Sequence, residues 1–250
     1  MAPILLCERV AKAFGALRAV DGVSFAVEAG ETFGIAGPNG SGKSTLFNVI
    51  TGVPYPADAG RVIFDGRRIE RMAPHRICRA GIARTFQKDA AFPALTVRQN
   101  VRLGAVYGRP AERRPVGGTT AEELLAFVGI AEDQYERHPG EISLFDRKKL
   151  MIASALATVP RLLLLDEPAS GLTGPEIEPL IGLIRKLKGH GVTVLVIEHV
   201  LSLLLTVSER LMVLNQGQVL TIGGPDEVVR DPSVVEAYLG SRGERADAAA

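Results

Sequence analysis

The sequence predicts an α/β fold built on a parallel sheet, with an N-terminal antiparallel β subdomain and an inserted helical subdomain. Three observations lead to this expectation. A glycine-rich loop separates a short apolar strand, Thr32–Ala36, from a helical run, Ser44–Ile50. Two later segments, Leu162–Leu165 and Val192–Glu198, are almost wholly apolar, as strands buried in parallel sheets are. Between about residues 89 and 156, helical periodicity replaces the β-rich texture.

The N-terminal subdomain is expected from residues 4–33, which read as short β segments broken at Gly15, Gly22 and Gly30. The other elements expected before the insertion are a loop, Val53–Gly60, and a strand, Arg61–Phe64. The helices expected in the insertion are Val97–Val106, Ala121–Val128 and Asp146–Ala157, with an exposed connector at Gly108–Thr120. The elements expected after it are the helices Pro175–Gly189 and Val200–Ser208 and the hairpin strands Arg210–Asn215 and Gln218–Ile222.

These elements predict a single domain over residues 1–240. Its core is expected over about 1–88 and 157–240, and its helical subdomain over about 89–156. A polar, alanine-rich tail at 241–250 is expected to be disordered.

Charge and cysteine content exclude several classes of function. Lys and Arg number 29 against 28 Asp and Glu, so the net charge is only +1. A protein that binds nucleic acid by neutralising phosphates needs an excess of positive charge, so we expect no nucleic-acid partner. The two cysteines, Cys7 and Cys78, match neither a zinc nor a Cys-x-x-Cys spacing, and we expect reduced thiols of a cytosolic protein.

No segment is expected to cross a membrane. The N-terminal apolar run ends at Glu8, which is too early for a signal peptide. The longest later runs, 192–197 and 200–207, fall well short of the roughly 18 residues that a membrane span requires. If the chain acts at a membrane, another chain must therefore bring it there.

The glycine-rich loop fits the pattern G-x-x-x-x-G-K-[ST] between a strand and a helix. Its glycines let backbone N–H groups approach a triphosphate closely, and the helix that begins near Lys43 directs its positive dipole end at the same place. The Lys43 ammonium is expected to reach the β and γ phosphates, and the Ser44 hydroxyl to coordinate Mg²⁺. The sequence therefore predicts a P-loop NTPase core that binds ATP and Mg²⁺. The residues assigned to the nucleotide are Gly37, Pro38, Asn39, Gly40, Ser41, Gly42, Lys43, Ser44 and Thr45.

Two acidic residues follow a buried strand at the edge where α/β sheets bind ligands. Asp166 ends the apolar run and is expected to hold Mg²⁺, while Glu167 is expected to polarise the attacking water. The alternative is that the two acids cap the helix after Pro168. His199 follows the next buried strand at the same edge, which favours a contact with the γ phosphate.

These residues, in this order, resemble the ATPase family of ABC transporters over nearly the whole chain. The resemblance makes Gln87, in Arg-Thr-Phe-Gln, the Q-loop glutamine, with a role in catalysis and in Mg²⁺ binding. It makes Phe14 the aromatic residue that stacks on adenine, the alternative being a Phe in the core of a strand. It makes Ser143 the signature serine, which binds the γ phosphate of ATP held by the opposite subunit.

Four segments are similar to the branched-chain amino-acid importer class, at residues 81–87, 92–97, 196–199 and 235–240. This resemblance implies an ATPase subunit that energises the import of branched-chain amino acids or related small solutes. Its partners would be transmembrane permease subunits, a second ATPase subunit and, indirectly, a periplasmic or extracellular solute-binding protein. The chain would then be a peripheral protein at the cytoplasmic face of the inner membrane.

The signature motif departs from the family pattern. The usual Leu-Ser-Gly-Gly-Gln is replaced by Ile142-Ser143-Leu144-Phe145-Asp146, which loses both glycines and adds a negative charge near an anion-binding position. One reading is that the altered signature is weak and that the chain works best opposite a different ATPase subunit. The other is that the backbone amides suffice, so the variation is tolerated. The D-loop at 170–173 also lacks the usual closing aspartate or asparagine.

Three other functions fit the pattern less well. A soluble, non-transport ABC-type ATPase needs a coiled-coil insertion or tandem domains, which 250 residues do not hold. A P-loop kinase does not explain Gln87, the helical insertion and His199 in their relative order. A non-hydrolysing regulatory subunit would have no need of Glu167 beside an intact Lys43.

Overall fold

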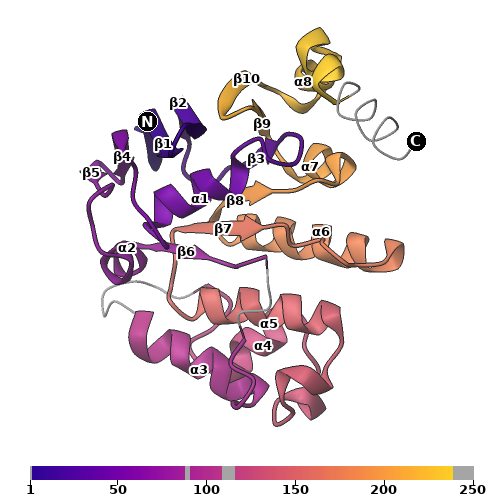
Figure 1. The fold of residues 1–250 in the computed structure, drawn as a ribbon. Helices are drawn as coiled ribbons and strands as arrows, with labels where there is room; N and C mark the ends of the chain where they lie inside the picture. Colours follow the sequence, from indigo (N-terminus) through magenta and orange to yellow (C-terminus); the bar gives the residue numbers. More distant parts are fainter. Residues whose placement is uncertain (1, 88–90, 109–115, 239–250) are drawn as a thin grey trace. The chain divides into compact units, whose positions relative to one another are not determined.

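The computed structural model describes residues 2–87, 91–108 and 116–238 of the chain (Figure 1). Contacts divide the chain into two compact units. The first unit comprises Met1–Met72 and Leu195–Ala250, and the second comprises Ala73–Val194.

The first unit contains an antiparallel sheet in the order β2-β1-β4-β5. Its strands are β1 (Leu5–Phe14), β2 (Leu17–Val27), β4 (Ala59–Phe64) and β5 (Arg67–Arg68). The prediction of short segments broken at Gly22 is wrong, because β2 continues through that residue. The pairing of β1 with β2 gains one residue on β2 between Val20 and Val23, and Gly22 has a φ of +70° there. A β-bulge therefore takes up the glycine without ending the strand.

The first unit also contains strands in the order β10-β9-β3-β8. They are β3 (Thr32–Ala36), β8 (Thr193–Ile197), β9 (Arg210–Asn215) and β10 (Gln218–Gly223), and the first two residues of β8 belong to the second unit. β3 runs parallel to β9, has the bounds of the predicted apolar strand, and is buried along its whole length. The helices of this unit are α1 (Lys43–Thr51), α7 (Leu201–Val207) and α8 (Pro225–Arg230), and residues 232–238 are helical as well.

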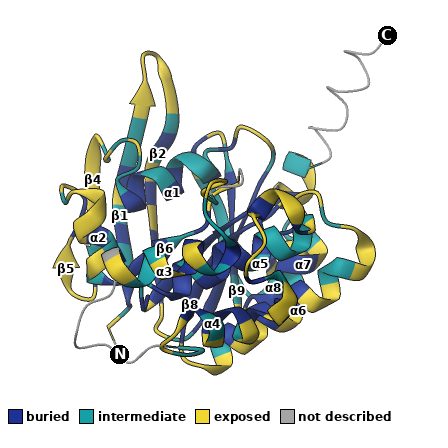
Figure 2. Cartoon of the chain, turned by 90° about the horizontal axis from the view of Figure 1, so that it is seen from below, coloured by how far each residue is buried: buried dark blue, intermediate teal, exposed yellow. Residues whose placement is uncertain are grey.

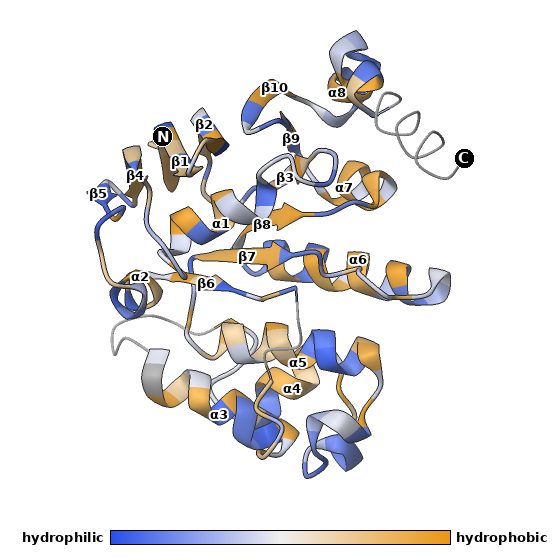
Figure 3. Ribbon diagram, viewed as in Figure 1, coloured by the Kyte–Doolittle hydropathy of each residue, from blue (hydrophilic) through white to orange (hydrophobic). Residues whose placement is uncertain are grey.

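The second unit pairs two parallel strands, β6 (Ile82–Arg84) and β7 (Leu162–Asp166). Its helices are α2 (Pro74–Ala80), α3 (Val97–Gly108), α4 (Ala121–Val128), α5 (Leu144–Leu156) and α6 (Gly174–Gly189), with 3₁₀ turns at Glu132–Gln134 and Pro139–Glu141. β7 is among the most hydrophobic parts of the chain (Figure 3). The sequence did not predict α2, although Pro74 at its first turn and Gly81 at its end mark its limits.

The helix α6 shows the amphipathic pattern on which its prediction rested. Leu180, Ile184 and Leu187 are buried on one face, whereas residues of the opposite face are exposed (Figure 2). This spacing of three and four residues is that of an α-helix packed on a core.

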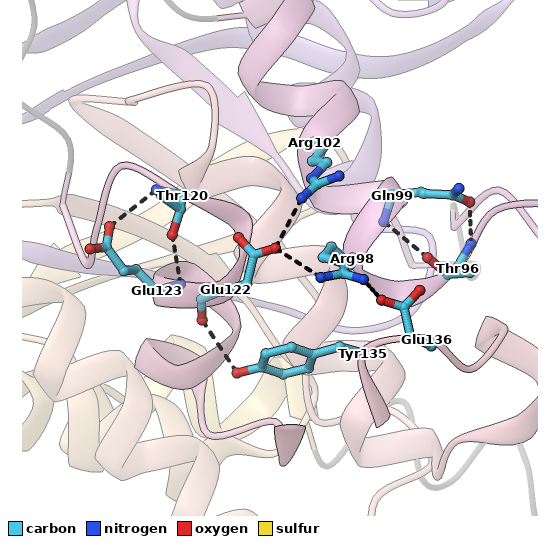
Figure 4. Close-up of polar contacts among 9 residues, drawn as sticks. All are labelled: Thr96, Arg98, Gln99, Arg102, Thr120, Glu122, Glu123, Tyr135 and Glu136. Atoms are coloured by element: carbon cyan, nitrogen blue, oxygen red, sulfur yellow. Dashed lines mark hydrogen bonds and ion pairs between the residues drawn. The ribbon is translucent and has the colours of Figure 1, made fainter. Parts of the chain in front are cut away.

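The helices α3, α4 and α5 pack against one another, and polar contacts join α3 to α4. Arg98 and Arg102 of α3 both donate to Glu122 of α4, at 3.3 and 3.0 Å (Figure 4). The Tyr135 hydroxyl donates to the main-chain oxygen of Glu122 at 3.3 Å. Thr120 caps α4 and receives the N–H of Glu123 at 3.1 Å, which completes a capping box.

Some expectations concern residues outside the described part of the chain. These are most of the connector, at 109–115, and the tail at 241–250. The limits of the helical subdomain, 89 and 156, stay a prediction. Within the described residues, no helix has both the length and the apolar character needed to cross a bilayer.

The contact between α3 and α5 leads to a stability prediction. A Cβ added at Gly104 of α3 would lie 2.4 Å from the Ser154 main-chain oxygen of α5. Gly104→Ala should therefore lower the free energy of unfolding by about 1–3 kcal/mol, since backbone cannot yield as a flexible side chain does.

The matched control is Gly182→Ala on the exposed face of α6. No described atom beyond the helix's own backbone and its chain neighbours lies within 4 Å of a Cβ built there. This substitution should be neutral or stabilise by up to about 1 kcal/mol through helix propensity. Urea denaturation of both variants measures the difference, and equal midpoints would contradict the proposed clash.

Candidate functional site

The glycine-rich loop lies in the first unit, between β3 and α1. The predicted strand Thr32–Ala36 is confirmed, and the helix begins at Lys43, one residue before the predicted start. Gly42 is the N-cap residue of α1 and has a φ of +103°. No side chain caps this helix, so its first N–H groups remain directed into the loop.

Two glycines of the loop lie too close to neighbouring backbone to carry a side chain. A Cβ at Gly37 would lie 2.1 Å from the Leu214 main-chain oxygen, and a Cβ at Gly42 would lie 2.1 Å from that of Ala19. The N–H of Gly217 donates to the Ser41 main-chain oxygen at 3.0 Å. The loop is therefore held on several sides by strands of its own unit, and only glycine fits at its two ends.

Lys43 is buried inside the loop, with 4% of its surface exposed. Its ammonium donates to the main-chain oxygens of Gly37 and Pro38, both at 2.8 Å, and lies 3.5 Å from the Ser41 hydroxyl. The charge is thus held in the concave side of a loop of backbone dipoles. An anion that enters the loop can replace these neutral main-chain oxygens as the partner of the ammonium, and its hydrogen bond with the ammonium would be stronger.

Phe14 ends β1 in the same unit and is 45% exposed. Its ring meets that of Tyr55 edge to face, with centroids 5.0 Å apart, and the Lys12 ammonium lies 5.5 Å from its centroid. The reading of Phe14 as a core residue is therefore wrong. An exposed ring of this kind is available for stacking.

His199 lies two residues beyond β8, which ends at Ile197 and not at the predicted Glu198. It is exposed, and its main-chain N–H donates to the Glu198 carboxylate at 3.1 Å. β8 is the sheet neighbour of β3, so His199 and the glycine-rich loop follow adjacent strands of the first unit.

Four polar residues gather at the ends of β6 and β7 in the second unit. Arg84 ends β6 and donates to the Asp166 carboxylate at 2.6 Å, with only 6% and 3% of the two side chains exposed. The Gln87 amide donates to the Glu167 carboxylate at 2.5 Å. The parallel register of the strands, Arg84 opposite Leu164, brings these pairs together.

Asp166 keeps one oxygen of its carboxylate without a hydrogen-bond partner among the described residues, although that oxygen is buried. The other oxygen is the one that Arg84 holds. A buried carboxylate oxygen without a hydrogen-bond partner is suited to bind a hard cation such as Mg²⁺, which is typically bound by one or two carboxylates together with phosphates.

Glu167 is buried and has a φ of +48°. This left-handed backbone is uncommon for glutamate and is found chiefly at sites where the surrounding structure imposes it. The next residues, Pro168 to Ser170, form a turn and not a helix. The alternative, in which the two acids cap a helix after Pro168, therefore lacks a helix at that position.

Ser143 is the N-cap of α5, which begins two residues before the predicted Asp146. Its hydroxyl accepts the Asp146 N–H at 3.0 Å and donates to the Asp146 carboxylate at 2.8 Å. Lys149 pairs with the same carboxylate at 2.6 Å. Burial would raise the pKa of Asp146, but the bonds from Lys149 and Ser143 outweigh it and hold the pKa below its usual value.

The predicted site residues thus fall into two groups. The first unit holds Phe14, the loop Gly37–Thr45 and His199, and the second holds Gln87, Ser143, Asp166 and Glu167. Sequence reasoning missed Arg84, the partner of Asp166. The signal was a charged residue at the end of a short apolar run, three positions before Gln87.

Comparisons with known proteins show the family of the chain. The chain matches the family model described as ABC transporter over residues 20–170, and a branched-chain amino acid ATP-binding cassette transporter model over residues 218–244. It is 37% identical to the high-affinity branched-chain amino acid transport ATP-binding protein BraF of Pseudomonas aeruginosa, over 95% of this chain and 98% of that protein.

Solved structures give the same result. The ADP conformation of an ATP-binding cassette of an ABC transporter is similar with a TM-score of 0.84 and 35% identity, covering 96% of this chain and 100% of that one. A dimeric cassette bound to ADP and Pi in a post-hydrolysis state has a TM-score of 0.77 and 27% identity, covering 88% and 98%. The chain belongs to the ABC transporter family, as one of its ATP-binding cassettes.

Proposed function

We propose that this chain binds Mg-ATP with the loop Gly37–Thr45 and hydrolyses it to energise an importer. The observation that carries the proposal is Lys43, buried inside a loop whose two end glycines admit no side chain. A β or γ phosphate would take the ammonium from the main-chain oxygens of Gly37 and Pro38. Ser44 would then coordinate Mg²⁺, and Phe14 would stack on the adenine.

The lysine provides the first test. Lys43→Ala removes the positive charge from the loop and should weaken ATP binding by about ten- to a hundredfold, as loss of a charge-assisted hydrogen bond does. Calorimetric titration of Mg-ATP measures the change. Lys186→Ala is the control, because that exposed lysine lies on α6 and donates to the Phe127 main-chain oxygen. An unchanged dissociation constant for Lys43→Ala would contradict the proposal.

The hydrolytic step is assigned to residues that follow three different strands. Asp166 would hold Mg²⁺ through its unpartnered oxygen, and Mg²⁺ would neutralise charge on the phosphates. Glu167 would orient and deprotonate the attacking water, with Gln87 holding its carboxylate and contributing to the Mg²⁺ site. His199 would contact the γ phosphate.

Glu167→Gln separates binding from hydrolysis. It keeps the size and hydrogen-bonding reach of the side chain but removes the base, so turnover should fall by about 10²- to 10³-fold while the ATP dissociation constant changes by less than about threefold. Phosphate release under saturating ATP measures the first quantity, and calorimetry the second. Glu178→Gln, on the exposed face of α6, is the matched control. Hydrolysis by Glu167→Gln at the wild-type rate would show that another group is the base.

The transported solute is proposed from relatives and not from the nucleotide site. The names of BraF and of the family model matched at residues 218–244 both refer to branched-chain amino acids. We therefore propose that the importer transports these or related small solutes. The partners would be transmembrane permease subunits, a second ATPase subunit and, indirectly, a periplasmic or extracellular solute-binding protein. The chain would work as a peripheral protein on the cytoplasmic face of the inner membrane.

The altered signature motif suggests that the second ATPase subunit is a different chain. The Ser143 hydroxyl donates its one proton to Asp146 and so does not offer it to a phosphate. In a homodimer both composite sites would carry this arrangement. A partner with the standard motif would instead complete a full site around the ATP that this chain holds.

The isolated chain should therefore hydrolyse ATP slowly and should be stimulated by its partner ATPase and permeases. Asp146→Ala should raise the isolated rate by releasing the Ser143 hydroxyl and removing a negative charge. Leu144→Gly with Phe145→Gly should raise it if the lost glycines are the limit. Steady-state ATPase assays of the three proteins decide the matter. Brisk wild-type turnover that neither variant improves would mean that the backbone amides of α5 suffice.

A further inference from the structure

The turn that joins β9 to β10 lies against the glycine-rich loop, in the same unit. Its two central residues, Gln216 and Gly217, have φ values of +48° and +79°. Positive φ at both positions is the geometry of a tight two-residue hairpin turn. Gln216 is exposed, whereas Gly217 is buried. The glycine therefore lies on the inner side of the turn, where it can contact other parts of the chain.

Gly217 connects two segments through its main-chain polar groups. Its N–H donates to the Ser41 main-chain oxygen of the glycine-rich loop at 3.0 Å, and its oxygen accepts from the Asp21 N–H of β2 at 2.8 Å. Beside the turn, the Gln218 amide donates to the Asp21 carboxylate at 3.1 Å. The turn thus bridges the phosphate loop and β2.

Ala19 of β2 brings the same three segments into direct contact. Its main-chain oxygen would lie 2.1 Å from a Cβ at Gly42 and 3.1 Å from a Cβ at Gly217. The Arg18 main-chain oxygen would lie 2.8 Å from the Cβ at Gly217. Loop, strand and turn therefore meet backbone to backbone, at a junction formed by Ala19, Gly42 and Gly217.

This junction lies where the hairpin of β1 and β2 becomes anchored. Residues 13–18 are exposed, Ala19 is half-buried and Val20 is buried. Phe14 pairs with Leu17 in the exposed part of the hairpin, just before Ala19. The ring to which adenine stacking is assigned is therefore carried on an exposed hairpin end, and the junction is where that end meets the phosphate loop.

A second anchor fixes the same hairpin end to the segment that follows α1. The Lys12 ammonium binds the Asp58 carboxylate at 2.6 Å, and the Phe14 ring meets that of Tyr55. Neither Tyr55 nor Asp58 belongs to the phosphate loop, so this anchor does not itself relate the ring to the phosphates. The junction does so, because Gly42 is part of that loop.

We propose that Gly217 is a positioning residue for ATP, which holds β2 at the junction and thereby sets the distance from Phe14 to the phosphate loop. The inference rests on the proposed function, in which Phe14 stacks on adenine and the loop holds the phosphates. ATP engages both places at once and gains affinity when they are already correctly spaced. An inorganic triphosphate needs the loop alone.

Gly217→Ala tests this role, because its Cβ would lie 2.8 Å from the Arg18 main-chain oxygen and one backbone must move. The exposed end of β2 should yield, since the turn follows the buried strand β9. Stacking on an aromatic ring contributes about five- to a hundredfold to affinity. The dissociation constant of Mg-ATP should therefore rise by about five- to twentyfold, and that of tripolyphosphate with Mg²⁺ by less than about twofold. Calorimetry measures both.

The matched control is Gly66→Ala in the turn between β4 and β5. That turn has the same backbone, with φ values of +51° at Asp65 and +74° at Gly66. Apart from its chain neighbours, no described atom lies within 4 Å of a Cβ built at Gly66. The control therefore places alanine in the same left-handed conformation without the contact. It should leave the affinities for ATP and for tripolyphosphate at their wild-type values.

A double-mutant cycle with Phe14→Ala shows whether Gly217 acts through the ring. Phe14→Ala alone should raise the ATP dissociation constant by about five- to a hundredfold. In that background the ring can no longer be misplaced, so Gly217→Ala should raise the constant further by less than about twofold.

Three outcomes would overturn the inference. Unchanged ATP affinity in Gly217→Ala would show that the junction sets no distance that matters. Equal losses for ATP and tripolyphosphate would mean that the turn supports the phosphate loop alone. Losses that simply multiply in the double variant would mean that Gly217 does not act through Phe14. Failure of the wild-type chain to bind ATP, or of Phe14→Ala to weaken that binding, would instead contradict the proposed function.

Discussion

The first unit depends on one constraint, the close passage of the glycine-rich loop between backbone segments of other strands. Main-chain oxygens of Leu214 and Ala19 stand where a side chain at Gly37 or Gly42 would begin. Because the loop cannot move outward, the ammonium of Lys43 is confined to its inner side among backbone dipoles. Sheet, turn and loop thus form one support for a concentrated negative charge, which is what binding of a triphosphate requires.

The second unit solves a different electrostatic problem, that of two acidic residues side by side in a buried place. Arg84 neutralises one oxygen of Asp166, and Gln87 binds Glu167 without neutralising it. Asp166 is left with a single unpartnered oxygen, whereas the Glu167 carboxylate accepts from the neutral amide of Gln87. The two neighbouring carboxylates therefore have different surroundings, as the different roles proposed for them require.

Local patterns account for what the sequence could predict, and long-range contacts account for what it could not. The loop, Lys43 and the buried strands each follow from a few adjacent residues, so the fold class and the family are confirmed. Arg84 meets Asp166 only because β6 pairs with β7, and Gly22 stays within β2 only because β1 accepts a bulge. The hydrogen bond between Ser143 and Asp146 could have been predicted, since Ser-x-x-Asp is a pattern typical of helix N-termini. Only the negative charge of Asp146 entered the prediction from sequence.

The left-handed backbone of Glu167 lowers the stability of the folded chain. A glutamate held in this conformation gives up of order 1–3 kcal/mol relative to a residue that adopts it freely. Glycine at this position would relieve the strain and make the folded chain more resistant to heat, yet it would carry no carboxylate. Selection for thermal resistance alone would therefore favour loss of this glutamate, whereas the role proposed for it in hydrolysis would favour keeping it.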